Sequence, residues 1–168
     1  MVYTLRVVLD VENEVFCQIK ITEDANLEEL HLAIKKAFEI ESNEMASFYL
    51  SNYLWDQGEE IPLEDFDEIG VSMASTLVGD AFKNDQLIYV YDLMLMFTFL
   101  IEKVKEEPKK AKSPKFEIEL VYGKMPKEAQ EKIMESVEEE DEFSDLEESQ
   151  DAWSDDYEDL DDLEESYY

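Results

Sequence analysis

Negative charge is concentrated at one end of this chain, and it limits how much of the chain can fold. Residues 127–168 hold 20 of the 45 aspartates and glutamates but only two of the 14 bases, for a net charge of −18. Residues 1–126 carry the remaining −13 of the total of −31. Like-charge repulsion and sparse aliphatic side chains oppose core formation in such a segment. We therefore expect one folded domain over residues 1–125 and an acidic tail over 126–168, with one helix in 127–140 and disorder beyond it.

Residues 89–104, YVYDLMLMFTFLIEKV, form the most apolar run in the chain. Its uncharged stretch from Leu93 to Ile101 lies between Asp92 and Glu102. A membrane-spanning helix needs about 20 predominantly apolar residues. The run is therefore too short to span a membrane, and it predicts core strands of a soluble protein.

The start of the chain predicts a β-hairpin followed by a helix. Residues 3–9 are rich in β-branched and aromatic side chains, and residues 14–22 alternate between apolar and polar side chains, so both predict strands. Turn-forming residues between them favour antiparallel pairing. Residues 24–40 carry apolar side chains at three- and four-residue spacing, which predicts an amphipathic helix capped by Asp24 or Asn26.

The rest of the domain predicts further strands and one short helix. The expected segments are a strand in 45–55, a turn-rich surface segment in 56–70, a short helix and turn in 75–86, strands in 87–92 and 96–104, a polar linker in 105–115 and a last strand in 116–123. The fold class is therefore α+β, with a mixed or antiparallel sheet packed against a few helices.

The charge also restricts the partners. A net charge of −31 argues against binding a nucleic-acid backbone or an anionic membrane surface, and it favours a basic protein. A single cysteine, Cys17, excludes an internal disulfide and fits a reducing compartment. The N-terminus shows no secretory signal, so we expect a cytoplasmic protein.

Three features together resemble the plasmid pRi ORF-3-like family of small bacterial and archaeal proteins, which are often encoded near mobile elements. They are LEELHLAIKKAF at residues 27–38, then Phe48, then LVGDAFKNDQLIYVYD at residues 77–92. The resemblance spans residues 1–122 and implies an α+β roll whose activity is not established. The family continues Tyr-Asp with Phe-Gly-Asp-x-Trp, whereas this chain has Leu93 and then MLMF at residues 94–97. The acidic tail lies outside the resemblance.

Four residues are candidates for ligand binding: Tyr89, Tyr91, Asp92 and His31. His31 is the only histidine, and it could act as a base or ligand or could be a satisfied residue at the edge of the helix stripe. Asp92 lies within an apolar run, so it must be exposed, paired or hydrogen-bonded. It could face a ligand beside the tyrosines or accept backbone N–H groups in a turn.

Other candidates favour packing over chemistry. Cys17 falls on the apolar face of its strand and predicts a buried thiol. Met94, Met96 and Phe97 predict core packing, with an adaptable binding groove or a homo-oligomer interface as alternatives. The sequence indicates no catalytic residue, metal site or cofactor.

Aromatic and aliphatic side chains interrupt the acidic tail at intervals of three to seven residues. This pattern is typical of segments that fold on a partner, and Trp153, Asp155, Asp156 and Tyr157 are the candidate contacts. The alternative is a solvated tail that only maintains solubility. We expect a non-enzymatic interaction protein, a monomer or weak homo-oligomer, whose tail engages a basic partner. The alternative function is a small-ligand or metal-dependent enzyme that uses Asp92, His31 and Tyr91.

Overall fold

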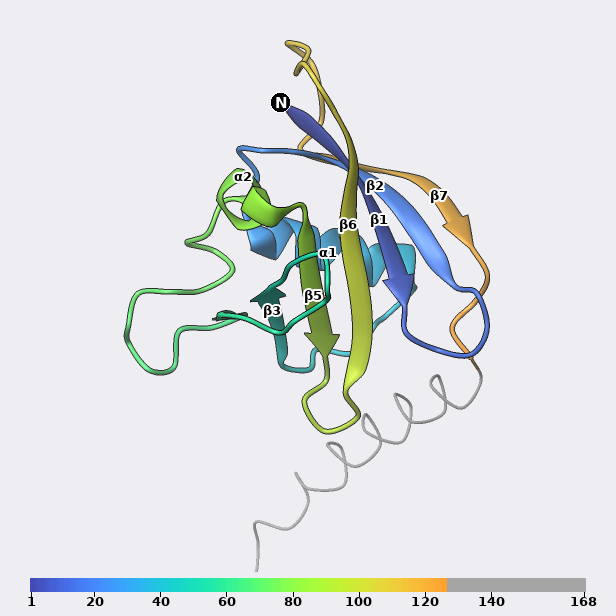
Figure 1. Ribbon diagram of the computed structural model, residues 1–168, viewed down its shortest axis with the longest axis vertical. Coiled ribbons are helices and arrows are strands. Elements are labelled where there is room, and N and C mark those ends of the chain that lie inside the picture. The colour runs from blue at the N-terminus through green and yellow to red at the C-terminus, as the bar shows by residue number, and fades with distance from the viewer. Residues whose placement is uncertain (127–168) are drawn as a thin grey trace, which may run out of the picture.

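Seven strands form one antiparallel sheet in the computed structural model, which describes residues 1–126 (Figure 1). The order across the sheet is β4-β3-β5-β6-β1-β2-β7, and each neighbouring pair is antiparallel. The strands are β1 (Val2–Leu9), β2 (Phe16–Thr22), β3 (Ala46–Leu50), β4 (Glu60–Pro62), β5 (Gln86–Tyr91), β6 (Phe97–Glu107) and β7 (Phe116–Tyr122). The α+β prediction is confirmed, and the mixed alternative is wrong. Short connections join the paired strands β1 and β2, and the paired strands β5 and β6, and such connections permit only antiparallel pairing.

The predicted N-terminal hairpin is present, and its alternation decides which face is buried. Leu5 lies opposite Ile19, and Val7 lies opposite Cys17. These side chains point to the same face of the sheet and are fully buried. Successive side chains of a strand point to opposite faces, so the intervening residues are left on the outer face.

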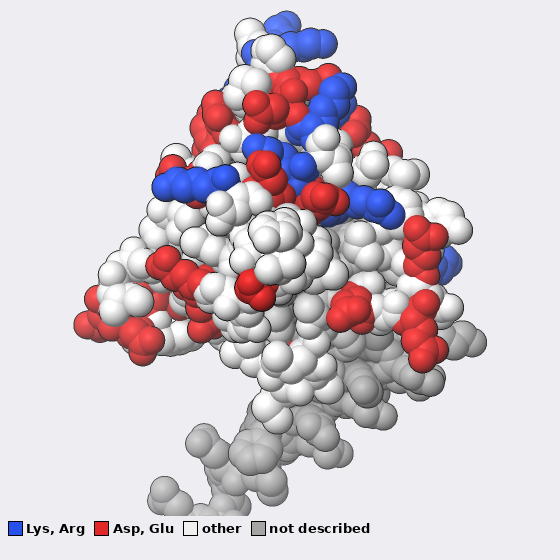
Figure 2. All heavy atoms as spheres, viewed as in Figure 1, with Lys and Arg blue, Asp and Glu red and all other residues white. Residues whose placement is uncertain are grey.

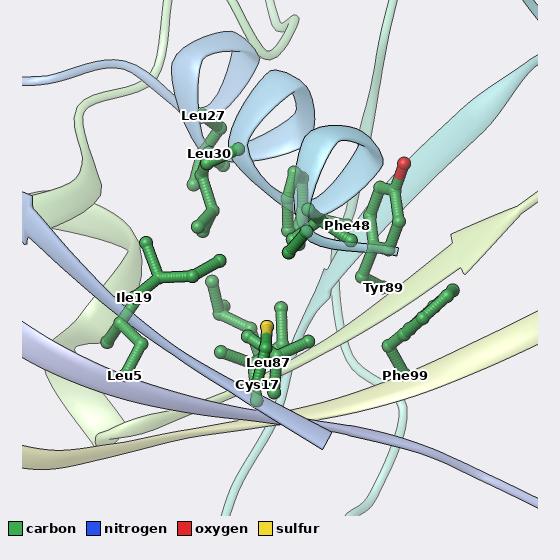
Figure 3. Close-up of a cluster of buried hydrophobic side chains, with 14 of the residues drawn as sticks. Leu5, Cys17, Ile19, Leu27, Leu30, Phe48, Leu87, Tyr89 and Phe99 are labelled. Carbon is green, nitrogen blue, oxygen red and sulfur yellow. The ribbon is translucent and has the colours of Figure 1, made fainter. Parts of the chain in front are cut away.

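Helix α1 (Leu27–Ala37) covers the inner face of the sheet. Asn26 is its N-cap and forms a capping box: its side chain accepts the Glu29 N–H (2.9 Å), and the Glu29 carboxylate accepts the Asn26 N–H (3.0 Å). This confirms Asn26 over Asp24 as the cap. In Figure 3, Leu27 and Leu30 point from α1 toward Leu5 and Ile19. The predicted apolar stripe is therefore the side of α1 that completes the core.

The apolar run forms β5, a turn and the first part of β6, as expected. Tyr89, Tyr91 and Phe99 are fully buried on the inner face, and Ile88 and Val90 are also buried on the outer face. A central strand buried on both faces explains why the run has no polar alternation. Within residues 1–126, no helix has both the length and the apolar character needed to cross a bilayer.

Two predicted loop segments contain strand. Ile61 lies in the expected surface segment, but it pairs with Phe48 and is buried, so β4 forms at the edge of the sheet. β6 continues to Glu107, into the expected linker, because β1 continues to pair with it. The strand expected in 45–55 ends at Leu50. The short helix expected in 75–86 is present as α2 (Val78–Ala81) and the 3₁₀ turn η1 (Phe82–Asn84).

Replacing the cap of α1 should destabilise the fold. Asn26→Ala removes the side-chain acceptor of the Glu29 N–H, and we expect it to lower the free energy of unfolding by about 1 kcal/mol. Asn84→Ala, at an exposed position with no capping role, is the matched control and should have little effect. Urea denaturation followed by circular dichroism measures both variants. Equal stability of the two variants would contradict the role of the capping box.

Candidate functional site

The single histidine lies in the core, between α1 and the sheet. His31 is 5% exposed, and its Nδ1 lies 2.7 Å from the hydroxyl oxygen of Tyr89 on β5. Its ring packs against the rings of Tyr89 and Tyr91 at centroid distances of 5.9 and 6.4 Å. The sequence separates His31 and Tyr89 by 58 residues. The hydrogen bond between them therefore satisfies two polar groups whose burial in the core would otherwise be costly.

The buried environment keeps this pair uncharged. Burial, together with the nearby Lys35 ammonium, lowers the pKa of His31 to about 4. Burial also raises the pKa of Tyr89 well above its ordinary value, with a smaller contribution from Tyr91. A neutral imidazole and a protonated phenol can share one hydrogen bond in either direction. At neutral pH both groups are therefore uncharged, and a pKa of about 4 makes the His31 imidazole a weak base.

Tyr91 joins β5 to the segment that enters β3. Its O–H donates to the Ser42 carbonyl oxygen (2.7 Å) and accepts the Glu44 N–H (3.1 Å). The Ser42 Oγ lies 2.7 Å from the same hydroxyl. Burial raises the pKa of Tyr91, and its hydrogen bonds with Ser42 and the Glu44 amide act in the opposite direction. These contacts are those of a buried tyrosine that ties down the neighbouring loop.

Asp92 organises the turn between β5 and β6. Its Oδ1 accepts the N–H groups of Met94 (2.9 Å) and Leu95 (3.1 Å), and its own N–H donates to the Met45 carbonyl oxygen (2.8 Å). The residue is buried and has a left-handed backbone, with φ of 59°. Aspartate tolerates this conformation better than most residues because its short side chain hydrogen-bonds locally. Asp92 therefore makes the contacts expected of a residue that accepts backbone N–H groups in a turn.

The structure therefore brings together His31, Tyr89 and Tyr91, but it directs the Asp92 carboxylate into its own turn. Ligand binding by these four residues stays a prediction. Cys17 is fully buried, which confirms the predicted buried thiol, and burial raises the pKa of that thiol to about 12. The candidate tail residues Trp153, Asp155, Asp156 and Tyr157 lie outside the described residues.

The Asp92 turn also forms part of an open pocket of about 430 Å³. Leu93 lies on one side of the pocket, next to Met45, whose carbonyl oxygen holds Asp92. The pocket is completed by β3, β4 and the loop that follows β4. Its lining residues are Met45, Ser47, Glu60, Pro62, Glu64, Asp65, Phe66, Asp67, Ile69 and Leu93. The pocket therefore combines apolar side chains with four carboxylates and no base.

Sequence reasoning missed this pocket. Residues 56–70 were expected to be a turn-rich surface segment, and the pocket depends on the pairing of β4 with β3. One signal was present: residues 59–69 alternate carboxylates with apolar side chains, in the segment EEIPLEDFDEI. Met94, at 91% exposure, and Met96 lie in the turn beyond the strand, so core packing is right for Phe97 and wrong for the two methionines.

Comparison with known proteins decides the family. The model of the plasmid pRiA4b ORF-3-like protein family matches residues 1–164. The chain belongs to this family. The match confirms the resemblance seen in the helix and β5 motifs, and it corrects the expected extent of the resemblance. The family match continues through most of the acidic tail, which had been placed outside it.

A solved structure supports the family fold. The chain is similar to the crystal structure of MM3350, a protein of unknown function from Methanosarcina mazei Go1, with a TM-score of 0.61 and 20% identity. The match covers 71% of this chain and 68% of that chain. At this identity the likeness shows the fold alone. No curated protein matches the chain.

The low pKa of His31 should make stability depend on pH. The unfolded chain takes up a proton near pH 6.5, whereas the folded chain resists it until about pH 4. The neutral state of His31 therefore contributes to the free energy of unfolding fully above pH 6.5, and this contribution is lost as the pH falls toward 4. Its upper limit is about 3 kcal/mol. Relative to wild type, His31→Gln should therefore lose less stability over this range. Tyr89→Phe keeps the imidazole and should keep the pH dependence. Parallel stability curves for wild type and His31→Gln, from urea denaturation between pH 7 and 4, would contradict this account.

Replacing Asp92 should disturb the turn more than it disturbs the core. Asp92→Ala removes the acceptor of two N–H groups and places alanine in a left-handed conformation, so we expect a loss of about 2 kcal/mol. Asp92→Asn retains a side-chain oxygen and tolerates the same backbone, so its loss should be clearly smaller. Thermal and urea denaturation compare the two variants. If asparagine is as disruptive as alanine, the hydrogen bonds of the turn are not the cause.

Proposed function

We propose that this protein is a non-enzymatic interaction protein that binds a basic protein partner. The observation that carries the proposal is the face around the Asp92 turn, where exposed apolar side chains lie beside carboxylates that no base within residues 1–126 neutralises. Figure 2 shows basic residues toward the upper part of the view, and carboxylates with uncharged atoms over the lower part of the described surface. Such a surface complements a partner that is both cationic and partly apolar.

The ion pairs of the described domain support this reading. There are eight ion pairs within residues 1–126. Each joins a lysine, an arginine or the N-terminus to a carboxylate, and in one of them Lys115 pairs with Glu29 on α1. None includes a carboxylate of the pocket. Half of the lysines and arginines of residues 1–126 thus have a carboxylate partner, whereas the carboxylates of residues 56–68 pair with no base in this part of the chain. An uneven charge distribution of this kind steers oppositely charged partners toward one face.

The tail adds to the same field in this proposal. Its composition, −18 with Trp153 and Tyr157 among the acids, suits a segment that contacts a basic surface through charge and aromatic burial. Two copies of so acidic a chain repel each other, so we propose a monomer or weak homo-oligomer. The single cysteine, buried and reduced, is consistent with a cytoplasmic location as part of this proposal.

The alternative function, a ligand-binding or metal-dependent enzyme centred on His31, Tyr91 and Asp92, is not favoured by the contacts. His31 and Tyr91 are buried and hydrogen-bonded to protein groups, and Asp92 is bonded to its own turn. A ligand at these residues would have to displace each of those contacts.

Binding of a basic partner should depend on salt and on the tail. The full chain, immobilised, should retain basic proteins from a bacterial extract, and retention should fall as salt rises to physiological strength. A full-length variant with Asp155→Asn, Asp156→Asn, Trp153→Ala and Tyr157→Ala should retain less of the same proteins. The binding of a recovered partner is then measured in purified form, by calorimetry. A matched variant with Glu12→Gln and Asp80→Asn tests whether the loss of any two charges has the same effect.

Two results would contradict the proposal. The first is retention of the same proteins by the wild type and the tail variant, which would remove the tail from the mechanism. The second is affinity for the purified partner that does not change between low and physiological salt, which would remove charge from it.

A further inference from the structure

A single carboxylate, that of Asp65, organises the loop that forms one wall of the pocket beside the Asp92 turn. The two oxygens of Asp65 accept the N–H groups of Ile69 (3.0 Å) and Gly70 (2.6 Å), and Gly70 has a φ of 82° that favours glycine. These bonds close the loop after β4 into a compact turn. Phe66 and Asp67 therefore lie on a loop whose backbone is already organised before any partner arrives, which lowers the entropic cost of binding.

The remaining carboxylates of the pocket differ in what they contact. Glu60 accepts a hydrogen bond from the buried Ser47 hydroxyl (2.7 Å), which orients it. Glu64 and Asp67 are exposed, and within residues 1–126 their carboxylates take part in no hydrogen bond or ion pair. The pocket thus holds two carboxylates that are available to a cation from outside.

The apolar side chains of the pocket are more exposed than a core would allow. Phe66 is 66% exposed and Ile69 is 71% exposed, and Leu93 extends this surface toward Met94. Exposed apolar side chains that gather around a pocket are typical of a docking site. A small inorganic cation would leave these side chains in water, whereas a long side chain with an aliphatic stem would cover them.

We propose that this pocket receives an arginine or lysine side chain from an extended segment of the basic partner. The charged end lies between Glu64 and Asp67, the aliphatic stem covers Ile69 and Leu93, and the Phe66 ring offers its face to the cation. An apolar residue of the partner next to the basic one contacts Met94 and Met96. The inference rests on the proposed function, because it assigns the contact that the described domain makes with that partner.

The test is a nuclear magnetic resonance titration of the full-length protein with short peptides. The probe is a capped five-residue peptide with one arginine between two leucines, and its matched control has citrulline, the uncharged isostere, in place of arginine. The arginine peptide should shift the amide signals of Phe66, Ile69 and Leu93, and the citrulline peptide should not. A lysine peptide compares the two basic side chains, because only the guanidinium can bridge two carboxylates in one plane.

Variants of the full chain show whether the contact is local. Glu64→Gln with Asp67→Asn should weaken arginine-peptide binding about fivefold, since two exposed ion pairs are lost. Glu12→Gln with Asp80→Asn removes the same charge from exposed positions that do not line the pocket, and it should weaken binding less than about twofold. Phe66→Ala should also weaken binding, and its effect should persist at about 0.5 M salt, where ion pairs are screened.

Several outcomes would overturn this inference and leave the proposed function standing. They are equal weakening by the two charge variants, equal binding of the citrulline peptide, and peptide-induced shifts confined to signals of residues 127–168. Light scattering tests whether the pocket is instead occupied by a second copy of the chain, which a drop in oligomeric state for Phe66→Ala would show. If the immobilised wild type retains no basic protein in the salt-dependent experiment above, the proposed function itself is contradicted.

Discussion

The apolar stripe of α1 can be buried only if every strand beneath it turns its alternate side chains to the same side. Leu27, Leu30 and Ile34 are fully buried against this inner face, so the registers of β1, β2 and β5 depend on each other through the helix. A slip of one residue in β1 or β2 would turn its fully buried side chains to the outer face of the sheet. The same constraint places Tyr89 beneath His31, where the two polar groups satisfy each other inside an otherwise apolar layer.

The position of the turn follows from this register. Tyr91 is the last inward residue of β5, and Asp92 then closes the chain toward β6 with a left-handed backbone and two accepted N–H groups. Because Asp92 also donates to Met45, the turn is fixed to the strand entering the other half of the sheet. Leu93 thereby lies at the pocket. The Asp92 carboxylate bonds to its own turn, and through that turn it determines where Leu93 and the exposed methionines lie.

Local patterns in the sequence were enough for most of the fold. The alternation from Val15 to Ile21 identified the buried face of β2, because periodicity depends on near neighbours. Capping residues narrowed the start of α1 to Asp24 or Asn26, and the structure decided between them. β4 was missed because its three residues form a strand only through pairing of Ile61 with Phe48, a tertiary effect. The contact of His31 with Tyr89 and the pocket were missed for the same reason, since both join segments far apart in the chain. The motif of β5 identified the family correctly but not the extent of the match.

Two of the residues that replace the family's Gly-Asp-x-Trp pattern, Met94 and Met96, add apolar surface, whereas Phe97 is buried in the core. Both methionines lie in the turn, where Met94 is 91% exposed and Met96 is 55% exposed. Exposed methionines would ordinarily favour self-association, since a second copy could bury them. In this chain each copy carries a net charge of −31, so the electrostatic repulsion between copies opposes that contact. A basic partner encounters no such barrier. We therefore propose that exposed methionines together with strong negative charge favour a cationic partner over a second copy of the same chain.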